Sequence, residues 1–211
     1  MISEAPLLLA SGLVGSIVMF AGDMLLYFTP GAYDMDGTLR PYAQIMHNLP
    51  EGRVRLGGLL GPVAAFLYIV GFVGLSMLGA GNLSWAMSAV AALLAFALIC
   101  GGAYHAQYPY LAIAARTGDD SLVEQVAGNI MALQRMATVP MYAGFVLLGV
   151  LIALGQTALP QWMVVLTPLV TSFLGFAWLR MPQPIRCVLF GGWSNLVFTI
   201  MFAALLAFML V

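Results

Sequence analysis

The sequence contains no lysine, and only 7% of its 211 residues are charged. A soluble globular domain has about 25% charged residues, so this shortage excludes that class. The seven cationic side chains are all arginine, they form no basic run, and the net charge is -1. Nucleic-acid binding would require clustered cations opposite the phosphates, so we expect no nucleic-acid partner.

Cysteine and histidine occur only twice each. Cys100 and Cys187 lack C-x-x-C spacing and lie in or beside apolar runs, which favours small buried side chains over a redox pair. A catalytic zinc site needs three protein ligands, and the only candidates are Asp23, His47 and His105, without H-E-x-x-H spacing. We therefore expect no metal, no haem and no other cofactor.

Two catalytic motifs are absent as well. No G-x-S-x-G elbow occurs, which argues against a serine hydrolase, and no glycine-rich phosphate loop occurs, which argues against nucleotide hydrolysis. What the sequence has instead is a 63% share of hydrophobic residues and a mean hydropathy of +1.01. The apolar runs do not alternate with polar residues as membrane strands would, so we predict membrane-spanning helices.

We predict a single all-α integral-membrane domain, a polytopic bundle of six transmembrane helices. Because a bilayer core of about 30 Å needs roughly 20 apolar residues per helix, the spans cover about residues 6–27, 56–78, 83–108, 136–154, 162–179 and 187–211. The long first connection contains a short amphipathic segment, about Pro41 to Asn48, which we expect to lie at the membrane interface as a lid. Ser121 and Glu124 have the spacing of a capping box, which predicts a helix leading into the fourth span.

All seven arginines fall in or beside the first, third and fifth connections, and none falls in the even connections or at the termini. The positive-inside rule therefore predicts that the odd connections are cytoplasmic and that both termini lie outside. The expected location is a plasma membrane of the bacterial inner-membrane type.

The stretch 101–110 contains the only histidine within a predicted span, His105, together with two glycines, a glutamine and three tyrosines. Asp23 is the only carboxylate within a span, and it lies at a similar depth near the cytoplasmic side. A carboxylate beside an imidazole at low dielectric can share a proton near neutral pH, as acid–base catalysis requires. The predicted catalytic residues are Asp23, His105, Asn195 and Tyr108. Asn195 and Tyr108 would polarise a carbonyl or hydroxyl group of the substrate.

Further polar and aromatic side chains fall in the cytoplasmic half of the predicted bundle, where they would line a cavity open to the cytoplasm or its leaflet. Gln134, Thr138 and Tyr142 repeat at four-residue intervals and would form one wall. The predicted substrate-binding residues are Tyr27, His47, Tyr104, Gln134, Thr138, Tyr142, Trp193 and Thr199.

Three functions remain open at this stage. The first is a membrane enzyme that acts on a lipid-like or small apolar molecule through Asp23 and His105. The second is a proton-coupled carrier, which the lack of matching polar positions in the two halves makes less favourable, although a homodimeric carrier stays open. The third is a structural membrane subunit in which the pair ties two spans together. We expect membrane lipids as partners and, for the first two functions, a lipid-like or small-molecule ligand.

Overall fold

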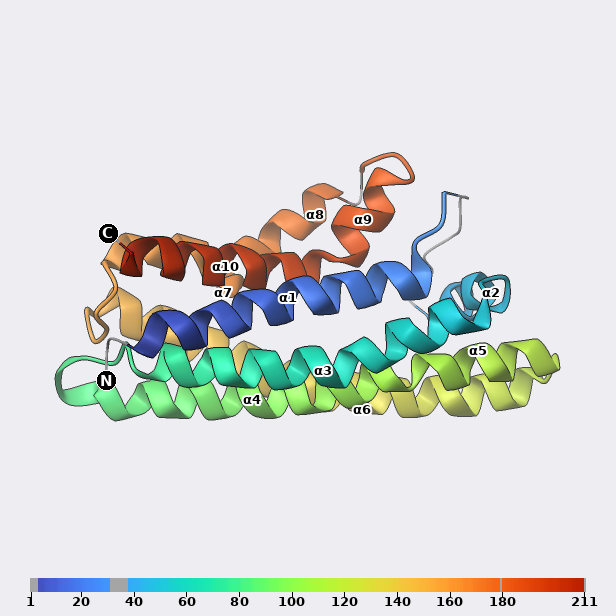
Figure 1. Ribbon diagram of the computed structural model, residues 1–211, viewed down its shortest axis with the longest axis horizontal. Helices are drawn as coiled ribbons and strands as arrows, with labels where there is room; N and C mark the ends of the chain where they lie inside the picture. Colours follow the sequence, from blue (N-terminus) through green and yellow to red (C-terminus); the bar gives the residue numbers. More distant parts are fainter. Residues whose placement is uncertain (1–3, 31–37, 179, 211) are drawn as a thin grey trace.

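The computed structural model describes residues 4–30, 38–178 and 180–210. These residues form helices and turns, apart from one isolated antiparallel β-bridge between Gly79 and Thr157. The prediction of an all-α fold is confirmed. Both chain ends lie at one end of the elongated bundle, and the short helix α2 (Arg40–His47) lies at the other (Figure 1).

Four long apolar helical segments run side by side along the long axis (Figure 1). They are α1 (Ala5–Tyr27), α3 (Glu51–Ser76), η2 (Gly81–Leu83) with α4 (Ser84–Ala106) and its continuation α5 (Tyr108–Thr117), and α6 (Asp120–Ala153). Each is long and apolar enough to cross a membrane, which indicates an integral membrane protein. The break between α4 and α5 falls at Gln107, two residues before Pro109.

The C-terminal part of the chain differs from the predicted pattern of two continuous spans. It consists of η3 (Gln161–Leu166), α7 (Pro168–Thr171), η4 (Ser172–Leu174), α8 (Gly175–Trp178), α9 (Ile185–Gly191) and α10 (Trp193–Met209). Thr167 is extended because it precedes a proline, which interrupts the fifth predicted span. The sixth is interrupted at Gly192, and α10, with 17 residues, is about 25 Å long, shorter than the apolar core of a bilayer. Six spans therefore stay a prediction.

Two apolar clusters fill the interior, one toward each end of the bundle. The larger cluster contains Met19 of α1 and Phe198 of α10, and the smaller one, beneath α2, contains Tyr27 of α1 and Tyr108 of α5. Asp23 lies between Met19 and Tyr27 on α1. The polar group described below therefore occupies the boundary between the two clusters.

The helix α6 runs without interruption for 34 residues, as the sequence predicts, but its N-cap is Asp119. The Asp119 carboxylate accepts hydrogen bonds from the backbone N–H groups of Ser121 (2.9 Å) and Leu122 (3.2 Å). The bond from the Ser121 hydroxyl, and then the two backbone bonds, lower the pKa of Asp119. The predicted capping box is therefore wrong, and Glu124 instead forms an ion pair with Arg40 at 2.5 Å.

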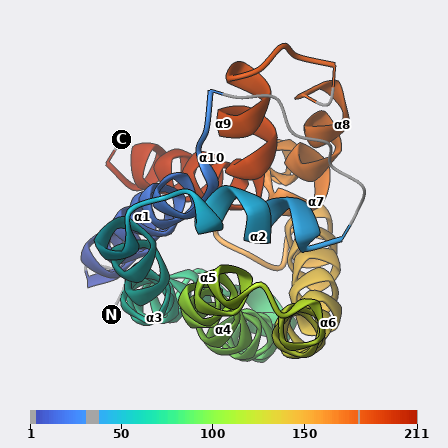
Figure 2. The same ribbon diagram turned by 90° about the vertical axis from the view of Figure 1, so that its right-hand side faces the viewer.

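The predicted interfacial helix in the first connection is α2, which has Pro41 in its first turn. Viewed from that end, α2 lies across the bundle, between α1 and α9 on one side and α5 and α6 on the other (Figure 2). Its buried face carries Ile45 and Met46, which belong to the smaller apolar cluster. The ion pair from Arg40 to α6 adds a polar attachment, so α2 covers this end of the bundle.

Candidate functional site

A cavity of about 250 Å³ lies between α1, α4, α6 and α10, close to α2. Eight of the side chains predicted from the sequence as site residues line it: Asp23, Tyr27, Tyr104, His105, Tyr108, Gln134, Thr138 and Asn195. Apolar side chains such as Leu98, Met141 and Phe198 complete the lining. The structure thus brings residues from both halves of the chain around one amphipathic space.

Asp23 is the centre of a buried hydrogen-bond network on the wall of this cavity. One carboxylate oxygen, Oδ1, lies 3.0 Å from His105 Nε2, and the other, Oδ2, accepts a 2.6 Å bond from the Asn195 side-chain amide. The Tyr68 hydroxyl in turn donates to Asn195 Oδ1 at 3.0 Å. Asp23, His105 and Asn195 are only 6%, 3% and 7% exposed, so water does not weaken these bonds.

Two glycines make room for the imidazole between α1 and α3. A methyl group at Gly61 would lie 2.4 Å from His105 Cβ, and one at Gly22 would lie 2.9 Å from His105 Cε1. These distances are far below van der Waals contact, so any larger side chain would displace the ring. Gly22 of α1 and Gly61 of α3 therefore fix where the imidazole meets Asp23.

Within the described chain, only one nitrogen of the His105 ring has a hydrogen-bond partner. In the tautomer with the proton on Nε2, the ring donates to the Asp23 carboxylate. Its Nδ1 atom is buried and has no hydrogen-bond partner among the described residues. A neutral ring leaves only a lone pair unpaired there, whereas a doubly protonated ring would bury an N–H without an acceptor, which costs more.

Four phenols surround the remaining wall of the cavity. The Tyr27 hydroxyl donates to the Gly191 carbonyl at 2.6 Å, and the hydroxyls of Tyr104 and Tyr108 share a short hydrogen bond. Tyr42 reaches the cavity from α2 and meets the Tyr27 ring edge-on, with centroids 5.4 Å apart. Burial and then the neighbouring Tyr104 raise the pKa of Tyr42, which keeps this phenol neutral.

Four predicted substrate-binding residues lie outside the cavity. Tyr142 is 47% exposed on the outer side of α6. A step of four residues exceeds one helical turn, so Tyr142 points away from the cavity wall that Gln134 and Thr138 form. The Trp193 indole donates to the Thr171 carbonyl at 3.2 Å, and the Thr199 hydroxyl donates to that of Ser16 at 2.9 Å. Trp193 and Thr199 therefore connect helices in the structure.

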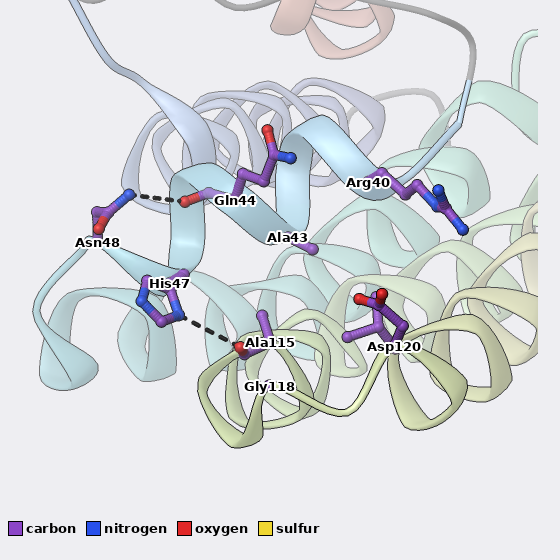
Figure 3. A pocket seen from close by; sticks show the side chains of 9 residues that line it. Arg40, Ala43, Gln44, His47, Asn48, Ala115, Gly118 and Asp120 are labelled. Carbon is purple, nitrogen blue, oxygen red and sulfur yellow. Dashed lines mark hydrogen bonds between the residues drawn. The ribbon is translucent and has the colours of Figure 1, made fainter.

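The fourth, His47, lines a separate polar pocket of about 380 Å³ between α2 and the α5–α6 turn. Its Nδ1 atom lies 3.3 Å from the Ala115 carbonyl, and Asn48 beside it donates to the Gln44 carbonyl (Figure 3). His47 and His105 thus belong to different pockets and do not form a joint ligand set. Within the described parts of the chain, no three His, Cys, Asp or Glu side chains gather closely enough to hold a metal ion.

Comparison with known proteins places the chain in a family. A family model matches residues 2–211. The chain belongs to DUF6796, a family of unknown function. No curated protein and no solved structure matches it. For this DUF6796 protein, function is therefore argued from the site itself.

Two important residues of this DUF6796 protein were not singled out by the sequence. Tyr68 is fully buried in the middle of α3, and its position as the single tyrosine of the predicted span 56–78 was a usable signal. Arg53 is the second. It donates to the carbonyls of Met24, Leu25 and Phe28 at 2.8–2.9 Å, and so caps the C-terminus of α1.

Proposed function

We propose that this DUF6796 protein is a membrane enzyme that acts on a small amphipathic or lipid-like molecule, with Asp23 and His105 as its acid–base pair. The observation that carries this proposal is the 3.0 Å contact between the two side chains on the wall of the cavity. A buried carboxylate and imidazole held together in a space lined by both phenols and apolar groups is an arrangement suited to proton transfer.

The size and lining of the cavity limit the ligand. Small-molecule sites usually measure about 300–1,000 Å³, so 250 Å³ accommodates a compact molecule or the reactive end of a longer one. Leu98, Met141 and Phe198 offer contact to an apolar part, while Gln134 and Thr138 offer hydrogen bonds to a polar part. An amphipathic molecule that enters from the membrane fits both requirements.

Within this site the side chains take different roles. Asp23 lines the cavity and would exchange a proton with a hydroxyl or an acidic C–H group of the substrate. His105 and Asn195 would donate to the carboxylate and so orient it toward the substrate. The hydroxyls of Tyr104 and Tyr108 would donate to an oxygen on which negative charge develops.

The proposed orientation places α2 and the cavity on the cytoplasmic side of a bacterial-type inner membrane. The distribution of the arginines supports it, and so does the position of both chain ends opposite α2 (Figure 1). The substrate would then come from the cytoplasm or from the inner leaflet.

A proton-coupled carrier is the second candidate, and the buried Nδ1 atom of His105 favours it. A second proton on the ring would have no acceptor among the described residues in this conformation. Protonation would therefore favour a rearranged state in which Nδ1–H finds a partner, and this is how protonation drives a conformational switch. In that case Asp23 and His105 would take up a proton without converting the ligand.

One comparison separates these functions. The wild-type protein and the Asp23→Asn variant, which keeps the size of the side chain, are incubated in vesicles that contain a lipid extract and small amphipathic metabolites, and products are analysed by mass spectrometry. An enzyme yields a new species with the wild type only. Ligand-dependent proton uptake without a new species supports the carrier. If the folded wild type shows neither a new species nor proton uptake, both proposed functions are wrong.

A further inference from the structure

A third concave site lies on the outside of the bundle, between α3 and α5 near the α2 end. It is a groove of about 310 Å³. Residues that are adjacent in sequence point to different sides here: His105 and Tyr108 line the internal cavity, whereas Ala106 and Pro109 line the groove. The groove is therefore distinct from the site of the proposed function, and an inference drawn from it stands independently.

Small residues create the groove. The Pro109 ring packs directly onto α3 at Gly58, where a methyl group would lie 2.5 Å from the ring carbons Cγ and Cδ. Beside this contact, Leu59 and Ile113 stand on the two helices and are 57% and 52% exposed. These side chains form an open apolar channel along the surface that faces the membrane.

The end of the groove nearest to α2 is basic. Arg55 is exposed and makes no ion pair with any described residue. Arg116 is held in place, because its Nη2 atom donates to the carbonyls of Leu49 (2.8 Å) and Met46 (3.4 Å). Its Nε and Nη1 donors have no partner within the described part of the chain. Glu51 is the only acid that lines the groove, so one positive charge remains in excess.

The order of charged and apolar side chains is the same on both helices. On α3, Leu59 follows Arg55 by one turn toward the middle of the bundle. On α5, which runs in the opposite direction, Ile113 lies one turn nearer the middle than Arg116. Two cations therefore lie at the α2 end of the groove, and two apolar side chains continue from them toward the middle of the bundle.

We propose that this groove binds an anionic phospholipid. The phosphate lies between Arg55, whose guanidinium group offers paired N–H donors, and Arg116, which offers a single N–H donor, and an acyl chain lies along Leu59 and Ile113. A headgroup without a cation of its own, such as phosphatidylglycerol, is preferred over phosphatidylcholine, because the choline group would add a positive charge beside two arginines.

The test is a native mass spectrometry competition on the full-length protein in detergent, with equal amounts of phosphatidylglycerol and phosphatidylcholine of the same chain length. We expect the wild type to retain mainly phosphatidylglycerol. Arg55→Gln should reduce that retention about fivefold, since one arginine near the headgroup is lost. Glu51→Gln should increase it, and Arg135→Gln, which removes an exposed arginine of α6 outside the groove, should not change it.

Two outcomes would overturn the proposal. One is equal retention of both lipids by the wild type. The other is the same loss in Arg135→Gln as in Arg55→Gln, which would indicate a diffuse charge effect. Glycerol 3-phosphate is added as a soluble competitor, and displacement of the lipid at equal concentration would show that the apolar channel contributes nothing. Because Arg55 forms no ion pair with a residue that the structure describes, its substitution is expected to leave the fold intact.

Discussion

Asn195 and Asp23 are 172 residues apart in the chain and are joined by a 2.6 Å hydrogen bond from the amide of one to the carboxylate of the other. Asn195 also accepts a bond from Tyr68, so its side chain satisfies two buried groups on two other helices. The network therefore holds α1, α3, α4 and α10 together at the cavity, and its members can be tested one at a time.

Replacing Asn195 by leucine should lower the free energy of unfolding by about 3 kcal/mol, because Tyr68 and Asp23 each lose a partner in a buried site. Tyr68→Phe is the matched control. It removes a single neutral hydrogen bond and should cost about 1 kcal/mol. Unfolding in detergent, followed by circular dichroism, measures both. Equal effects of the two substitutions would contradict a central role for Asn195.

Gly61→Ala should displace the His105 ring, because the added methyl group would lie 2.4 Å from His105 Cβ. Overpacking of this kind costs about 1–3 kcal/mol, and the Asp23–His105 contact should break. Gly128→Ala on α6 is the control, since its methyl group would meet nothing within 4 Å. Unfolding temperatures report the cost, and the imidazole signal in NMR spectra reports the contact. An unchanged His105 signal in Gly61→Ala would refute the role assigned to this glycine.

Arg53→Lys should destabilise the protein although it preserves the charge. The guanidinium group bonds to three carbonyls at the end of α1, and a lysine ammonium cannot reproduce that planar arrangement. We expect a loss of about 1–3 kcal/mol. Arg135→Lys, at an exposed position on α6, should be close to neutral in the same unfolding assay. Similar stabilities of the two variants would show that the cap contributes little.

The start of α6 should depend on pH through Asp119. Its pKa is lowered in the folded protein, so the stabilisation is present above the ordinary value of 3.8 and is lost as the pH falls through the lower, folded value. The protection of the Ser121 and Leu122 amides against hydrogen exchange, relative to the intrinsic rate at each pH, should therefore fall in acid, and Asp119→Ala should show low protection at neutral pH as well. Slow exchange in that variant would mean that another group caps the helix.

Much of the fold follows from local properties of the chain. The four long apolar helices, the interfacial helix α2 and the uninterrupted α6 were predicted, because run length and hydropathy determine whether a segment can cross a bilayer. The two C-terminal spans were less well predicted. Their hydropathy suits a span, but Thr167 before its proline and Gly192 interrupt the helices, and hydropathy does not detect such interruptions.

The candidate site was also predicted only in part from the sequence. Asp23, His105 and Asn195 could be selected from the sequence, because polar side chains in apolar runs are costly unless they have a partner. Tyr142 and His47 were placed in the cavity by helical spacing and by sequence position, and both lie elsewhere in the structure. Helical spacing gives the relative direction of two side chains on one helix, but it leaves the rotation of that helix toward its neighbours undetermined.

The sequence by itself determined that this is a helical membrane protein, since that property depends on run length and hydropathy along the chain. Only the tertiary structure decided that Asn195 bonds to Asp23, that Tyr68 completes the network and that Arg53 caps α1. Those contacts depend on how closely helices approach and in which register. Small residues such as Gly22 and Gly61 set that approach by steric fit between segments far apart in the chain.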